Sequence, residues 1–324
     1  MLLVFLVVLV CSVAAWASIG SFRAGLTAAA AVNPRGAFAA GLAFVCSLVA
    51  SAFAWRVGFG SVGARIGRLQ ACANYGVGSL VNTFVPARLG DVVRAGLFAR
   101  TLPAGRGRAL TAAGVVGAVE VCRAFVHAAV IVAAAGLGAV PLWPVLVLVG
   151  VALCALGTAV VTRRRGPTSR LAQLAEAAAA IVARPSLGLR ILGWVAVAAS
   201  ARIAAAFLVC ASLGVGSPLV AALVITAAME IAGAFPITPG NVGITSGAIS
   251  LALAGHGVAL PTALAVGLVF HAIESAAGVS FGLASSSVVA RPRLLQRPLV
   301  RFGAAVTAAA GLAVLGAAML PDVG

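Results

Sequence analysis

Acidic side chains are scarce in this sequence, and half of them fall inside apolar stretches. There are six acidic residues among 324, and Glu120, Glu230 and Glu274 lie in segments apolar enough to be membrane spans. An ionised side chain at the centre of a bilayer costs about 2.5–3.5 kcal/mol on insertion scales, so such residues normally face a partner or a water-filled cavity. The sequence therefore predicts a polar interior that these carboxylates share.

Helical spacing places these carboxylates beside cationic or titratable side chains. Glu120, Arg123 and His127 follow one another at intervals that put them on one stripe of a helix. His271 and Glu274 are also close enough to share one face. The predicted intramembrane polar site consists of Glu120, Arg123, Glu230, His271 and Glu274. The alternative is that these charges only neutralise each other and lock helices together.

A first motif joins an apolar segment to a basic stretch, and it reads N-T-F-V-P-A-R-L-G-D-V-V-R over residues 82–94. Pro86 ends the apolar segment, because proline cannot continue a helix. A helix that begins near Arg88 would place Arg88, Asp91 and Arg94 on one side, where two guanidiniums and the terminal amides suit a lipid phosphate. The predicted head-group site consists of Asn82, Arg88, Asp91 and Arg94. The alternative is an ordinary basic loop with a local Asp–Arg pair.

A second motif reads P-I-T-P-G-N-V-G-I-T-S-G over residues 236–247. Two prolines and three glycines among these 12 residues interrupt any helix. At membrane depth the freed backbone groups need partners, and broken helices there often line a ligand or ion site. The predicted broken-helix motif consists of Pro236, Pro239, Gly240 and Gly243. A plain connecting loop is the alternative.

Enzyme signatures are absent from the sequence. It has no Gly-x-Ser-x-Gly elbow, no His-Glu-x-x-His motif and no Walker loop. The six cysteines are scattered without a Cys-x-x-Cys pair, so we interpret them as apolar filler rather than as metal ligands or disulfides. We therefore expect no enzyme activity, no catalytic residues, no cofactor and no metal.

The composition predicts an all-α fold, a polytopic bundle of transmembrane helices. Apolar residues make up 63% of the chain and charged residues 9%, whereas about a quarter of a soluble domain is charged. The net charge of +16 falls in short clusters between apolar runs, which favours loops beside anionic lipid over contact with nucleic acid. We interpret residues 1–324 as one integral membrane domain, with motif 82–94 in its first half and motif 236–247 in its second.

Apolar stretches of about 20 residues are long enough to cross a bilayer. The eight predicted spans are 1–20, 37–56, 109–138, 142–162, 187–212, 217–235, 260–289 and 302–320. Two shorter stretches, 69–86 and 241–256, are predicted to be half-helices or re-entrant hairpins, one in each half, as at the central site of transporter folds. No tandem repeat stands out. Residues 1–17 resemble a signal peptide but have no arginine before the apolar core, so we expect a retained first helix.

Together the two motifs resemble the flippase-like family named for the transmembrane region of lysylphosphatidylglycerol synthases. The patterns N-x-x-x-P-A-R-x-G-D-x-x-R and P-I-T-P-G-x-x-G stand in the order and spacing of that family. Glu120 with Arg123 is similar to a Glu–Arg pair in its next helix. Thr245 and Ser246 depart from the pattern, because family members commonly carry Arg-Glu there, and no charged role carries over to them.

The resemblance implies a multi-helix protein of the bacterial inner membrane that moves or handles lipids, without the soluble domain that makes the lipid in the fused synthases. The favoured hypothesis is translocation between leaflets of a phospholipid or polyprenyl-phosphate lipid with an anionic or phosphate-bearing head group. Two alternatives stay open. One is a non-transporting membrane partner of a glycosyltransferase or lipid-modifying enzyme, and the other is a proton-coupled small-solute carrier.

The distribution of arginine predicts the orientation in the cytoplasmic membrane. Most arginines lie in four stretches, at 56–68, 88–108, 163–190 and 291–301, while residues 139–141 and 213–218 contain none. The positive-inside rule then places these basic stretches and the N-terminus in the cytoplasm. In a cysteine-free background, a cysteine introduced at 163–170 should react with an impermeant maleimide only after the membrane is opened. Labelling in intact cells would contradict this orientation.

Overall fold

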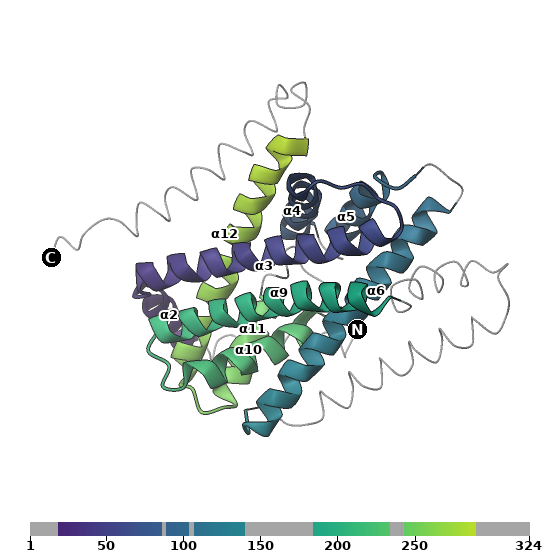
Figure 1. Ribbon diagram of the computed structural model, residues 1–324. Helices are drawn as coiled ribbons and strands as arrows, with labels where there is room; N and C mark the ends of the chain where they lie inside the picture. Colours follow the sequence, from purple (N-terminus) through teal and green to yellow (C-terminus); the bar gives the residue numbers. More distant parts are fainter. Residues whose placement is uncertain are drawn as a thin grey trace, which may run out of the picture.

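The computed structural model describes residues 19–85, 89–103, 107–139, 184–233, 241 and 243–289. The prediction of an all-helical protein is confirmed for these residues, which contain no strand (Figure 1). The helices are α2 (Ile19–Ala30), α3 (Pro34–Ser61), α4 (Arg68–Phe84), α5 (Leu89–Ala99), α6 (Arg108–Gly136), α9 (Pro185–Ser212), α10 (Pro218–Gly233), α11 (Ile244–Ala254) and α12 (Leu260–Val289).

Within the described ranges, four helices are long and apolar enough to cross a membrane, namely α3, α6, α9 and α12. They correspond to the predicted spans 37–56, 109–138, 187–212 and 260–289. The predicted span 217–235 is α10, and its 16 residues rise only about 24 Å, less than the ~30 Å of a hydrocarbon core. The predicted spans 142–162 and 302–320, and nearly all of 1–20, lie outside the described residues.

The described helices form two halves with the same order of helix lengths. Helices α3 to α6 have 28, 17, 11 and 29 residues, and helices α9 to α12 have 28, 16, 11 and 30. Helices α3 and α9 lie side by side and run in opposite directions (Figure 1). Gly36 near the start of α3 lies against Ser212 at the end of α9, and Gly58 near the end of α3 faces Ile191. The two halves therefore form an inverted repeat.

Each half contains one short helical hairpin. In the first half, α4 begins beyond the end of α3, and the chain returns as α5. In the second half, α10 begins beyond the end of α9, and the chain returns as α11. Because α3 and α9 are antiparallel, the two hairpins start at opposite ends of the bundle. In the first hairpin, Gly90 lies so close to the Gly78 carbonyl and the Asn82 side chain that any side chain there would collide. The predicted short segments 69–86 and 241–256 are each one arm of such a hairpin.

The first hairpin packs on α12 of the opposite half through small residues. A Cβ atom added to Gly282 would lie 2.8 Å from the carbonyl oxygen of Gly76, so the two backbones are in direct contact. The Ser285 hydroxyl donates a hydrogen bond of 3.3 Å to the Cys72 carbonyl across the same contact. Such small-residue packing is typical of helix pairs in membranes, where close backbone approach supplies the attraction.

Substitution of Gly282 by alanine should destabilise the protein by roughly 1–3 kcal/mol, because the added methyl group overpacks the contact with α4. The midpoint of thermal unfolding in detergent, followed by circular dichroism, would report the loss. Gly117→Ala in α6 is the matched control, since a Cβ atom there meets nothing within 4 Å. The unfolding midpoint of Gly117→Ala should be unchanged or slightly higher, because alanine favours a helix more than glycine does. Equal losses in both variants would contradict the proposed close packing.

Candidate functional site

A cavity of about 370 Å³ lies where the two hairpins end. Thr83 and Asp91 of the first hairpin and Gly233 and Thr245 of the second line it, together with the middle parts of α3, α6, α9 and α12. Its charged or titratable lining residues are Tyr75, Asp91, Arg94, Glu120, Arg123, His127, Arg202, Glu230, His271 and Glu274. All five residues of the predicted intramembrane polar site therefore lie on the wall of one cavity.

The predicted head-group residues Asn82, Asp91 and Arg94 also line this cavity, while Arg88 lies outside the described residues. The second motif is described only in part. Three of the four residues of the predicted broken-helix motif lie outside the described residues, namely Pro236, Pro239 and Gly240. The fourth, Gly243, is described. Gly243 immediately precedes α11 and has a φ of 83°, a backbone conformation that favours glycine.

Asn241 lies between the two arms of the second hairpin. Its side-chain amide donates a hydrogen bond of 3.1 Å to the carbonyl of Ala232 near the end of α10, and Asn241 lines the cavity. The residue has a φ of 58°, which asparagine adopts more readily than most residues. In the described part of motif 236–247, Asn241 and Thr245 thus lie on the same cavity wall as Glu120.

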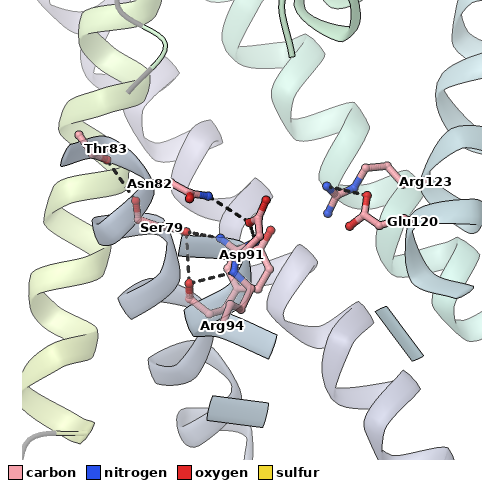
Figure 2. Close-up of polar contacts among 8 residues, drawn as sticks. Ser79, Asn82, Thr83, Asp91, Arg94, Glu120 and Arg123 are labelled. Atoms are coloured by element: carbon pink, nitrogen blue, oxygen red, sulfur yellow. Dashed lines mark hydrogen bonds and ion pairs between the residues drawn. The ribbon is translucent and has the colours of Figure 1, made fainter. Parts of the chain in front are cut away.

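Arg94 is buried in the first hairpin and has several partners there. Its Nη1 donates to Asp91 Oδ1 at 3.0 Å, and its Nη2 donates to the Ser79 hydroxyl at 3.1 Å. Nε donates to the Tyr75 carbonyl at 3.4 Å, and the guanidinium carbon lies 3.7 Å from the centre of the Tyr75 ring. The side-chain amide of Asn82 donates to Asp91 at 3.0 Å (Figure 2).

These bonds connect α4, which carries Ser79 and Asn82, to α5, which carries Asp91 and Arg94. The local Asp–Arg pair of the alternative interpretation is therefore present, and it is part of a larger network. The guanidinium of Arg94 uses all three of its nitrogens within the protein. Phosphate binding by Arg94 stays a prediction, and it would require these bonds to exchange for bonds to the lipid.

The long helices contribute further pairs to the cavity wall. On α6, Arg123 Nη1 lies 3.2 Å from Glu120 Oε2. Figure 2 shows this pair across from Asp91 and Arg94, with both groups turned toward the same space. The Glu120 side chain is 45% exposed and that of Arg123 is 31% exposed, so both are open to water or to a ligand.

Two more pairs join different helices. Arg202 on α9 donates a hydrogen bond to Glu274 on α12, and His127 Nδ1 on α6 lies 3.1 Å from Glu230 Oε1 on α10. Arg202 and His127 were not part of the predicted site. The signal that could have included them is the one that identified the glutamates, namely the cost of a charged or titratable side chain inside an apolar helix.

His271 brings unused hydrogen-bonding capacity to the cavity. Both of its ring nitrogens are buried, and neither has a hydrogen-bond partner among the residues that the structure describes. Buried polar atoms in native proteins are normally paired, so these nitrogens are suited to a bound ligand or water. In the described part of the chain, no three His, Cys, Asp or Glu side chains are grouped so as to hold a metal ion.

The comparison with known families identifies the chain. A sequence model of the family described as Lysylphosphatidylglycerol synthase TM region matches residues 1–282. The chain belongs to this family. No curated protein and no solved structure matches it. The match to the lysylphosphatidylglycerol synthase TM family covers all the residues that line the cavity.

Thr245 and Ser246, the two positions that depart from the motif of the lysylphosphatidylglycerol synthase TM family, lie in the first turn of α11. Both are buried, and Thr245 lines the cavity. Neutral hydroxyl groups therefore stand at the two positions where the resemblance implies Arg and Glu. In this member, the charges on the described cavity wall come from the first hairpin and from α6, α9, α10 and α12.

Substitution of Arg94 by lysine should destabilise the first hairpin, because lysine keeps the charge but loses the planar fork and the stacking on Tyr75. We expect a loss of roughly 1–3 kcal/mol, as for hydrogen bonds made by a charged group. Thermal unfolding in detergent measures this loss. Arg100→Lys, at an exposed position just beyond the end of α5, is the control and should leave the midpoint unchanged. An unchanged midpoint in Arg94→Lys would show that the network contributes no stability.

Proposed function

We propose that this protein moves a phosphate-bearing lipid between the two leaflets of the cytoplasmic membrane. The head group occupies the central cavity, and the apolar tails remain in the bilayer. The observation that carries the proposal is a cavity with a charged wall inside a bundle of apolar helices. A polar head group crosses hydrocarbon only at a large free-energy cost, and a polar interior lowers that cost.

The size of the cavity suits a head group rather than a whole lipid. Its volume of about 370 Å³ is at the lower end of the range for small-molecule pockets, about 300–1,000 Å³. The lipid tails have no need to enter it, because the outer faces of the long helices are themselves apolar. Family membership supports a lipid over a water-soluble solute, since the family is described by the lipid-modifying synthases that contain this region.

Arg123 is the described residue best placed to bind the phosphate. It lines the cavity, is partly exposed, and contacts Glu120 through Nη1. A guanidinium has five N–H donors, so Arg123 keeps donors that a phosphate oxygen can accept. Arg202 is placed similarly on α9, with its side chain 33% exposed.

The two ends of the bundle differ in positive charge, which supports an orientation. The end where α3 stops and α9 starts carries Arg56, Arg65, Arg68, Arg100, Arg108, Arg184 and Arg190. Among the described residues, the opposite end carries Arg35, with Arg23 on the adjoining α2. Under the positive-inside rule the first end faces the cytoplasm. The α4–α5 hairpin then enters from the cytoplasmic side and the α10–α11 hairpin from the outer side.

Purified protein in vesicles of phosphatidylethanolamine and phosphatidylglycerol should speed the exchange of fluorescently labelled phosphatidylglycerol between leaflets, measured by dithionite quenching. Arg123→Gln should lower this rate about tenfold, which corresponds to losing roughly 1.4 kcal/mol from a charge-assisted hydrogen bond. Arg68→Gln is the control, because Arg68 is exposed at the start of α4 and does not line the cavity.

Two outcomes would contradict the proposal. If wild-type protein does not speed the exchange of labelled phosphatidylglycerol or phosphatidylethanolamine, lipid movement is refuted and a non-transporting partner is favoured. If Arg123→Gln exchanges lipid as fast as wild type while retaining its fold, the head group does not bind at Arg123.

A further inference from the structure

We propose that His127 and Glu230 form a proton-binding site that couples lipid movement to a pH difference across the membrane. This inference rests on the proposed function and adds its energy source. Its basis is the way charges are paired on the cavity wall, the position of this pair between the two halves, and a second histidine on the same wall.

Four carboxylates and three arginines line the cavity in the described part of the chain. Each arginine contacts one carboxylate, in the pairs Arg94–Asp91, Arg123–Glu120 and Arg202–Glu274. The fourth carboxylate, Glu230, is paired instead with His127 at 3.1 Å. Guanidiniums stay protonated in proteins, whereas imidazole gains and loses a proton near neutral pH. The His127–Glu230 pair is therefore the one whose charge a proton can change.

The position of the pair allows a change in charge to act on the fold. His127 is on α6 of the first half, and Glu230 is near the end of α10 in the second hairpin. An imidazolium attracts the carboxylate more strongly than a neutral imidazole does. Proton uptake therefore strengthens the contact of the second hairpin with α6. The first hairpin lacks this dependence, because Gly76 and Gly282 hold it on α12 by backbone packing.

The surroundings of the pair are charged on several sides. Arg202 of α9 lines a small pocket together with His127 and Glu230. Helices α3 and α11 present no ionisable side chain to the cavity among the described residues. The other titratable or charged groups on the shared wall are Glu120 and Arg123 of α6, His271 and Glu274 of α12, Asp91 and Arg94 of α5, and Tyr75 of α4.

His271 is a second imidazole on the wall of the same cavity. Both of its ring nitrogens lack partners among the described residues, so one can accept a proton while the other releases one. On uptake, a hydronium ion gives its proton to His127 and leaves as water, and a new N–H bond forms on the imidazole while Glu230 stays ionised. Release on the other side of the membrane breaks that bond and returns the proton to water.

Vesicles with a pH difference of about one unit test the coupling, with labelled phosphatidylglycerol as the probe. A difference of one unit changes the ratio of protonated to unprotonated sites by up to about tenfold, so wild-type exchange should change by up to that factor. Glu230→Gln and His127→Gln should lose the response, giving the same rate with and without the difference. His256→Gln is the matched control, because His256 is exposed in the turn after α11, outside the cavity, and it should keep the response.

A second measurement separates this inference from the proposed function. The chain has three histidines, so nitrogen-15 histidine labelling gives few ring signals, which single His→Gln variants assign. The His127 signal should change with pH, and this titration should differ in Glu230→Gln. Absence of this titration overturns the proton site.

The remaining outcomes distinguish the two proposals. Wild-type exchange that is insensitive to the pH difference overturns the coupling and leaves the proposed function intact. A Glu230-dependent titration of His127 without any lipid movement supports the proton site and contradicts the proposed function alone.

Discussion

Ionised side chains in an apolar bundle are stable only where an opposite charge or a polar cavity meets them. In this protein that requirement determines which helices become neighbours around the centre. Arg202 brings α9 to Glu274 on α12, and His127 brings α6 to Glu230 on α10. Removing one partner of such a pair would leave a charge unpaired among apolar helices. The helices around the cavity are thus held together in part by the same groups that make the cavity polar.

The sequence contains the information on which residues gather at the centre, and much less on how they pair. The glutamates inside apolar segments could be assigned to a shared interior from their insertion cost alone. The pairing of Glu120 with Arg123 could be predicted from their helical spacing. The partners of Arg94 are harder to predict. Ser79, for example, lies on α4 and comes within hydrogen-bonding distance of Arg94 only when α4 and α5 pack together. Arg202 and Glu274 are 72 residues apart, and one sequence offers no signal for that pair.

One short segment was predicted in each half, but the inverted orientation of the halves was not predicted, for a related reason. The halves share helix lengths and chain path, whereas the residues differ, since α4 reads RLQACANYGVGSLVNTF and α10 reads PLVAALVITAAMEIAG. Close packing on α12 favours glycine in α4, and α10 packs without that constraint. Apolar composition also made the 217–235 segment resemble a full span. Within the described residues, the helix in this segment follows a turn at Gly214, which has a φ of 69°, and runs from Pro218 to Gly233.

Inverted symmetry has a thermodynamic consequence for a protein that opens to two sides. If the halves adopt slightly different conformations, exchanging those conformations turns an opening toward one leaflet into an opening toward the other. Both arrangements then share one helix topology, so the topology by itself favours neither direction. A bias of only about 1.4 kcal/mol shifts such an equilibrium tenfold. The surrounding gradients, rather than the architecture, would then decide which way the cargo travels.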